Sequence, residues 1–117
     1  MRGVIAVAEK DSLDQRIRDG LLLDNYAAQL TEKQRMACEM ILMQDLSLSE
    51  AAETLGVSRQ GVHDLITRAR EHMEGYEKSF GLVARRHKTE IMEQMLDDNR
   101  ERLPEDFYAA FKKILEA

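Results

Sequence analysis

One stretch of nineteen residues decides the fold, and over residues 48–66 it has the sequence LSEAAETLGVSRQGVHDLI. Glycine adopts a positive φ at no steric cost, so Gly56 can reverse the chain between two short helices. Ala52 is small where those helices have to cross closely, and Ser58 can cap the start of the second one. The stretch therefore predicts two helices joined by a tight turn, which is the arrangement of a helix-turn-helix.

The apolar residues of this stretch are spaced so that the two helices can bury them against each other. An ordinary corner between two helices, with no ligand, has the same packing, so this alternative stays open. The residues expected to face inward are Leu48, Ala51, Leu55, Val57, Val62, Leu65 and Ile66.

Capping patterns indicate where the first three helices begin. Ser12, Thr31 and Ser47 are each followed three residues later by Gln or Glu, which is the pattern of a capping box. Each pattern precedes a periodic apolar segment, so each is expected to start a helix. The predicted helices cover about 13–28, 32–44 and 48–55.

The first two helices are predicted to supply much of the core. The second is apolar almost all round over 36–43, so it is expected at the centre of the bundle. Its Cys38 is the one cysteine of the chain and is expected to be an inert buried thiol. The first helix carries a stripe at helical spacing that is expected to be buried: Leu13, Ile17, Leu21, Tyr26 and Leu30.

The rest of the chain is also predicted to be helical. Ser58 is expected to cap a long helix over about 59–80, and an amphipathic segment follows over about 85–101. A last helix starts near Pro104, with Phe107, Phe111, Ile114 and Leu115 on one face.

The expected fold class is therefore all-α. It is a helix-turn-helix without a wing, with a long fourth helix and a helical C-terminal extension. The expected parts are a flexible N-terminus over 1–11, a helix-turn-helix domain over 12–82 and the extension over 83–117.

Charge and composition limit the function. Seventeen Lys and Arg against 22 Asp and Glu give a net charge of −5. Phosphate contacts dominate affinity for nucleic acid, so such a site is expected as a local patch on an acidic body. A basic cluster at 85–88 either contacts phosphates or is a solvated helix start. The longest apolar runs are too short to span a bilayer, so we expect a cytoplasmic protein with no membrane insertion.

Catalytic and metal-binding patterns are weak. His63, His72 and His87 lack the spacing that places two metal ligands on one helical face. The sequence has no phosphate-binding glycine loop and no nucleophile elbow. We therefore expect no enzyme, no cofactor and no metal site.

The outward residues of the second motif helix are the candidate nucleic-acid site. In a major groove, Arg59 and Gln60 suit guanine and adenine edges, while Arg68 and Arg70 could meet phosphates. Asp64 on the same face would repel phosphate, so a solvated face of mixed charge is the alternative interpretation. The predicted nucleic-acid-binding residues are Ser58, Arg59, Gln60, His63, Thr67, Arg68 and Arg70.

The long fourth helix also carries an apolar seam with alternating spacings of four and three, as in a coiled coil. Either a second copy pairs with it or the first, fifth and sixth helices of the chain fold over it, and a homodimer is the favoured hypothesis. The seam comprises Val62, Ile66, Ala69, Met73, Tyr76 and Phe80, and its spacing continues to Val83.

Four segments together resemble the YlxM family over about residues 13–82: LTEKQR (30–35), DLSL (45–48), GVSRQGVHD (56–64) and YE (76–77). This family consists of small helix-turn-helix proteins that are similar to region 4 of sigma factors. Its members are associated with the bacterial signal recognition particle (SRP), because they are encoded beside that particle's GTPase and its receptor.

The resemblance implies a regulatory role in co-translational targeting, through the SRP RNA, the SRP GTPase or its receptor, or DNA. The leading hypothesis is a regulatory or accessory protein of the SRP pathway that binds nucleic acid. The alternatives are a sequence-specific DNA-binding transcriptional regulator and a helical bundle that binds protein only.

Overall fold

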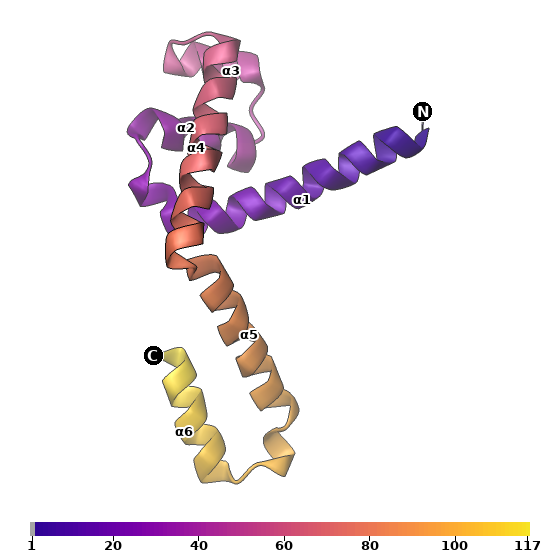
Figure 1. The fold of residues 1–117 in the computed structure, drawn as a ribbon, viewed down its shortest axis with the longest axis vertical. Coiled ribbons are helices and arrows are strands. Elements are labelled where there is room, and N and C mark those ends of the chain that lie inside the picture. Colours follow the sequence, from indigo (N-terminus) through magenta and orange to yellow (C-terminus); the bar gives the residue numbers. More distant parts are fainter. Residues whose placement is uncertain (1) are drawn as a thin grey trace. The chain divides into compact units, whose positions relative to one another are not determined.

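The computed structural model describes the backbone of residues 2–117 and the side chains of residues 13–117. The chain divides into two compact units, Met1–Phe80 and Gly81–Ala117. Every element of the described backbone is helical, which confirms the predicted all-α class (Figure 1). The first unit contains α1 (Arg2–Tyr26), α2 (Glu32–Cys38), α3 (Leu48–Leu55) and α4 (Arg59–Phe80), and the second contains α5 (Leu82–Asp98) and α6 (Glu105–Glu116).

The predicted start of the first helix near residue 13 is wrong, because the backbone of α1 is helical from Arg2 and Ser12 lies inside it. The flexible N-terminus, 1–11, stays a prediction, because its side chains are outside the described ones. The boundary at 82–83 between the domain and its extension is likewise only an expectation.

The capping boxes at the starts of α2 and α3 are confirmed. The Thr31 hydroxyl accepts a hydrogen bond from the Gln34 backbone N–H at 3.2 Å, and the Gln34 side chain accepts one from the Thr31 N–H. Ser47 and Glu50 form the same reciprocal pair. Each pair satisfies backbone donors that a helix start leaves without partners.

The turn between α3 and α4 has the predicted geometry. Gly56 has φ 69° and ψ 33°, a left-handed conformation. The Val57 N–H then donates to the Ala52 carbonyl at 3.0 Å, which closes the end of α3. The Ser58 hydroxyl accepts from the Gly61 N–H at 2.9 Å and so caps α4. These contacts form the helix-turn-helix that the sequence predicts.

The two helices pack through small residues, although one expected inward residue is exposed. Ala51 and Ala52 of α3 and Val62 of α4 are buried. Leu48 is exposed, because it lies in the first turn of α3, at the edge of the contact with α4.

In the first unit, α4 packs against α1, α2 and α3 (Figure 1). These neighbours bury the first four seam residues of α4: Val62, Ile66, Ala69 and Met73. A second copy cannot use side chains that the same chain already covers. The prediction that this seam forms a dimer interface is therefore wrong over that part; Tyr76 is half-buried and Phe80 is 62% exposed.

The buried face of α1 also differs from the predicted stripe. Leu13, Ile17 and Leu21 are exposed, and only Tyr26 of the stripe is fully buried. The prediction failed because it considered only the spacing of apolar residues. The face that α1 buries also includes the carboxylate of Asp19, which is in an ion pair. The residues that α1 buries are Asp19, Leu22, Leu23 and Tyr26.

The second predicted helix is divided. The α-helical bonding of α2 ends at Cys38, and a π-helical turn, η2 (Glu39–Met43), follows. The Gln44 N–H accordingly donates to the Glu39 carbonyl at 2.9 Å. Cys38 is buried as expected, and its burial raises the pKa of the thiol to about 11.

The second unit is a hairpin of α5 and α6, which run in opposite directions and are joined through η3 (Arg100–Arg102) (Figure 1). Of the predicted apolar face of α6, Phe107 and Ile114 are exposed. The buried residue of α6 is Tyr108, whose hydroxyl donates to Asp97 Oδ1 on α5 at 2.6 Å.

Replacing Gly56 tests the turn. Gly56→Ala is expected to lower the free energy of unfolding by about 1–2 kcal/mol, because a left-handed backbone costs an L-residue that much. Urea unfolding followed by circular dichroism measures the change. Gly75→Ala is the matched control: a Cβ there meets no heavy atom within 4 Å, and Gly75 lies inside α4. This control should stabilise the protein by about 0.5–1 kcal/mol, and a loss of stability in both variants would contradict the assignment.

Candidate nucleic-acid interface

The exposed start of α4 lies beside the start of α3. Arg59, Gln60 and His63 are all exposed on the first turns of α4. The N-terminal backbone of α3 faces the same region, and the first N–H groups of a helix have no partners inside it. Together the two helix starts line an open hollow of about 380 Å³: Ser47, Leu48, Ser49, Arg59, Gln60 and His63.

The start of α3 is the part of this site that sequence reasoning missed. The sequence pattern at Ser47 predicts only a helix start, although a capping box also indicates where the first backbone N–H groups of the helix lie. Such groups, together with the helix dipole, favour an anion at that end of the helix.

Gln60 has a partner on its own helix. Its Nε2 donates to Asp64 Oδ1 at 3.0 Å, one helical turn further on. Gln60 must exchange this bond for a base contact if it is to bind adenine through both of its amide groups. Asp64 therefore both positions Gln60 and adds a negative charge to the surface.

Two cations of this surface are unpaired. Among the residues that the structure describes, no carboxylate forms an ion pair with Arg59 or Arg68. Both side chains are exposed, so neither has to give up a protein partner before it contacts a phosphate or a base. Thr67, between Asp64 and Arg68 on the same helix, is half-buried, and the Ser58 hydroxyl is used as the cap of α4.

Arg70 does not belong to this surface, so its predicted phosphate contact needs correction. Its Nη2 lies 2.8 Å from Asp19 Oδ2, and its Nε lies 3.1 Å from both carboxylate oxygens. Asp19 is fully buried and also accepts a hydrogen bond from Gln15 at 2.8 Å. The Arg70 guanidinium therefore holds α1 against α4 and is not available to a phosphate.

A second, exposed pair joins the same two helices. Arg18 Nε and Nη2 each lie 2.9 Å from a carboxylate oxygen of Glu74. The hydrogen bond raises the pKa of Arg18 and lowers the pKa of Glu74. Near this pair the Tyr26 hydroxyl donates to Glu77 Oε1 at 2.6 Å. Polar contacts therefore fix α1 along the middle and end of α4 and leave the start of α4 exposed.

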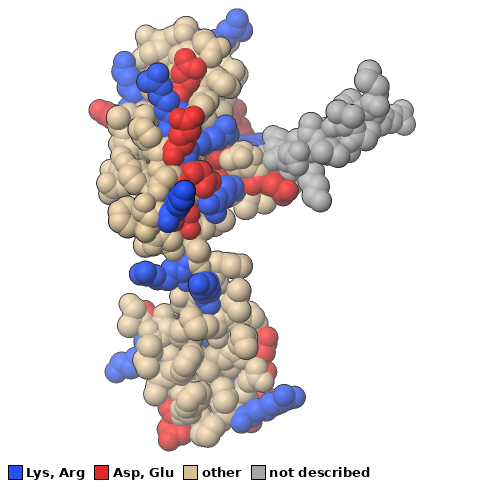
Figure 2. Space-filling view, in the orientation of Figure 1, with Lys and Arg blue, Asp and Glu red and all other residues tan. Residues whose placement is uncertain are grey.

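Charges of both signs surround the candidate site. Figure 2 shows Lys and Arg side chains interleaved with Asp and Glu on the visible face of the first unit. The net charge of −5 does not conflict with nucleic-acid binding if the contact is small, but it limits non-specific attraction to phosphates.

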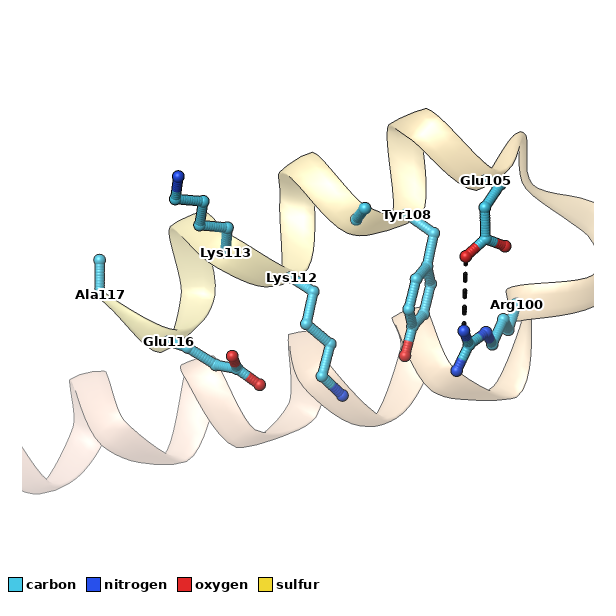
Figure 3. Close-up of a pocket in the computed structure, with 8 residues that line it drawn as sticks. Arg100, Glu105, Tyr108, Lys112, Lys113, Glu116 and Ala117 are labelled. Atoms are coloured by element: carbon cyan, nitrogen blue, oxygen red, sulfur yellow. Dashed lines mark hydrogen bonds and ion pairs between the residues drawn. The ribbon is translucent and has the colours of Figure 1, made fainter.

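Another hollow lies in the second unit (Figure 3). Lys113, one of the three cations that line it, is exposed, and the other two have partners. Arg100 lies 3.5 Å from Glu105 and 4.3 Å from the centre of the Tyr108 ring. Lys112 Nζ lies 3.0 Å from Asp97 Oδ1. The Tyr108 hydroxyl and this ammonium group lower the pKa of Asp97.

No group of His, Cys, Asp and Glu among the described residues has an arrangement that could hold a metal ion. In the same part of the chain, no helix combines the length and the apolar character needed to cross a membrane.

A tight two-helix turn with an exposed second helix defines the helix-turn-helix class of proteins. The family UPF0122, described as "Putative helix-turn-helix protein, YlxM / p13 like", matches residues 13–110. The chain belongs to this family, which confirms the resemblance found in the sequence. The family is one of helix-turn-helix proteins and not a family of enzymes.

Relatives in several bacteria carry the same family name. A UPF0122 protein of Caldanaerobacter subterraneus subsp. tengcongensis is 51% identical over 63 residues, which are 54% of this chain and 54% of that protein. One of Thermoanaerobacter sp. is 48% identical over 64% of this chain and 62% of its own length. The chain thus spans less than two thirds of these two relatives. One of Clostridium botulinum is 34% identical over 89% of this chain and 98% of its own length.

Replacing Arg70 tests its structural role. Arg70→Ala is expected to lower the free energy of unfolding by about 3 kcal/mol or more, because it leaves the Asp19 carboxylate buried without its cation. Arg18→Ala, which removes the exposed pair with Glu74, should cost less than about 1 kcal/mol. Urea unfolding of both variants measures the two losses in the free energy of unfolding. Equal, small losses would show that Asp19 does not depend on Arg70.

Proposed function

We propose that this protein is a regulatory nucleic-acid-binding protein that contacts its ligand with the start of α4. One observation supports this most directly: Arg59, Gln60 and His63 are exposed together in the hollow beside the start of α3. A recognition helix needs such side chains in its first turns, because that end enters the major groove.

The residues of this surface have different roles in the proposed contact. Arg59 donates two hydrogen bonds to a guanine edge, and Arg68, further along α4, meets a phosphate. The backbone N–H groups at the start of α3 donate hydrogen bonds to the neighbouring phosphate of the same strand. Gln60 binds a base only after it releases Asp64, so its contribution depends on the ligand.

Asp64 increases the selectivity of the contact between bases and lowers its affinity. Its carboxylate repels phosphates, but it can accept a hydrogen bond from the amino group of cytosine. Affinity for arbitrary duplexes is therefore low, and a ligand with the right base at this position is favoured.

The family resemblance supports a role of this activity in the SRP pathway. We infer a regulatory or accessory role in which the SRP RNA is the nucleic-acid ligand and the SRP GTPase or its receptor is the protein partner. The similarity to region 4 of sigma factors supports a helix-in-groove contact. In an RNA this contact requires a bulge or loop, because the major groove of an A-form duplex is too narrow for side chains to read. This role also places the protein in the cytoplasm.

A sequence-specific transcriptional regulator is the second candidate. It is favoured by the exposed Arg59 and Gln60, which have the side chains that read guanine and adenine in duplex DNA. The two candidates share the same surface and differ in ligand.

A side-by-side mobility-shift assay separates them. The full chain is titrated into SRP RNA and into random duplex DNA at modest salt, and a selected DNA pool is included. Preferential retention of the RNA supports the SRP role, and retention of a selected duplex alone supports the transcriptional role. Binding to none of the three, together with no capture of the SRP GTPase or its receptor, would contradict the proposed function.

Variants of the α4 surface test the contact itself. Arg59→Ala is expected to weaken binding about 5- to 100-fold, which corresponds to the loss of one bidentate base contact. Asp64→Asn is expected to strengthen it, because a negative charge is removed beside phosphates. Lys33→Ala is the control, because Lys33 is an exposed cation of α2 that does not line the hollow. Equal weakening by Arg59→Ala and Lys33→Ala would assign binding to net charge alone.

A further inference from the structure

The hairpin of α5 and α6 has a large apolar surface that its own residues do not cover. Within 81–117 the structure buries only Val83, Leu96 and Tyr108. Met95 is 61% exposed and Ile114 is 71% exposed, although both are large apolar side chains. The exposed or half-buried apolar residues of the two helices are Ile91, Met92, Met95, Phe107, Phe111 and Ile114.

These residues form one continuous face, the hairpin face. On α5, Ile91, Met92 and Met95 share one flank of the helix, next to the line on which Leu96 contacts α6. On α6, Phe107, Phe111 and Ile114 have the corresponding position relative to Tyr108. Because the two helices are antiparallel, both flanks lie on the same side of the hairpin. The rings of Phe107 and Phe111 lie 5.7 Å apart on it.

One group of polar side chains lies on the opposite side of the hairpin. The Tyr108 hydroxyl and Lys112 Nζ both donate to Asp97 Oδ1 there, and Figure 3 shows Tyr108 and Lys112 pointing from α6 toward α5. In Figure 2 the visible face of this unit has few charges in its middle and carries its Lys, Arg, Asp and Glu toward the edges. The surface is therefore divided into a polar side and an apolar side.

A unit of this size needs additional cover. The hairpin has 37 residues, and units below about 40 residues are usually stabilised by disulfides, metals or oligomerisation. No cysteine is present in 81–117. Exposed apolar patches of this kind mark interaction surfaces.

The distribution of charge indicates which partner fits. The end near the turn, 97–106, has five acidic and two basic residues. The open end, 82–90 with 111–117, has five basic and two acidic residues. Lys112 and Asp97 pair with each other, which leaves four basic and two acidic residues at the open end and four acidic and two basic at the turn end. The hairpin is thus positive at one end and negative at the other, with the apolar face between them.

We propose that the hairpin face binds the hairpin face of a second copy of this chain in antiparallel orientation, forming a four-helix bundle. This orientation places the basic open end of each copy against the acidic turn end of the other, whereas a parallel pair would place like charges together. The apolar residues of the two faces then cover each other around a common centre, near Met92 and Met95 on α5 and near Phe111 on α6.

This dimer differs from the one predicted along α4. The seam on α4 is covered by α1, α2 and α3 of the same chain, but the hairpin face has no such cover within its own unit. A dimer also carries two copies of the α4 surface, which raises the apparent affinity for a ligand with two sites.

Sedimentation equilibrium of the full chain at micromolar concentration tests the proposal. The expected mass is twice the 13.5 kDa of the chain. Met95→Glu should raise the dissociation constant about 10-fold or more, because it buries a charge in an apolar interface. Gln94→Glu is the matched control: it adds the same charge one residue earlier, on the polar flank of α5, and should leave the dimer intact.

A charge exchange tests the orientation. Lys88→Glu should weaken the dimer several-fold, and adding Asp98→Lys in the same chain should restore it, because the two positions face each other only in the antiparallel pair. Circular dichroism confirms that each variant is folded. A wild-type monomer at all concentrations, or equal effects of Met95→Glu and Gln94→Glu, would overturn the proposed interface. A failure of Asp98→Lys to restore association would overturn the antiparallel orientation. None of these outcomes depends on nucleic-acid binding, so they are distinct from failure of the proposed function.

Discussion

The left-handed backbone of Gly56 is the constraint on which the rest of the first unit depends. With φ 69° at this residue, α3 ends after two turns and α4 starts at once, capped by Ser58. The two helices then meet through Ala51, Ala52 and Val62, which are small enough for close approach. The same turn brings the starts of α3 and α4 together, so one backbone conformation creates both the core contact and the candidate interface.

A buried ion pair holds α1 against α4 in this unit. Asp19 has no exposed surface, and its carboxylate is satisfied by Arg70 and Gln15. Polar contacts specify a single register between α1 and α4 more strictly than apolar packing alone, because a shift of one turn would leave the carboxylate buried and unpaired. With α1, α2 and α3 all packed on α4, only its first turns and its exposed flank remain for a ligand.

Local signals in the sequence predicted the local structure well. The capping boxes at Thr31 and Ser47, the turn at Gly56 and the extent of α4 could be predicted because each depends on neighbouring residues. The face that α1 buries could not, because Asp19 is paired with a residue 51 positions away. Arg70 was misassigned for the same reason. A helical pattern does not distinguish a cation that is free at the surface from one that pairs with a distant buried carboxylate. The start of α3 was missed because its contribution comes from backbone groups, which the sequence does not display.

We propose that nucleic acid contacts the start of α3 and the exposed side of α4 from Arg59 to Arg68. The most direct measurement is a titration of the ¹⁵N-labelled full chain with the ligand retained in the mobility assay, followed by amide chemical shifts. We predict that the largest changes fall on Leu48 and Ser49 and on residues 59–68, with little change on α1. Shifts centred on α5 and α6, or on α1, with none at Arg59, would contradict the account.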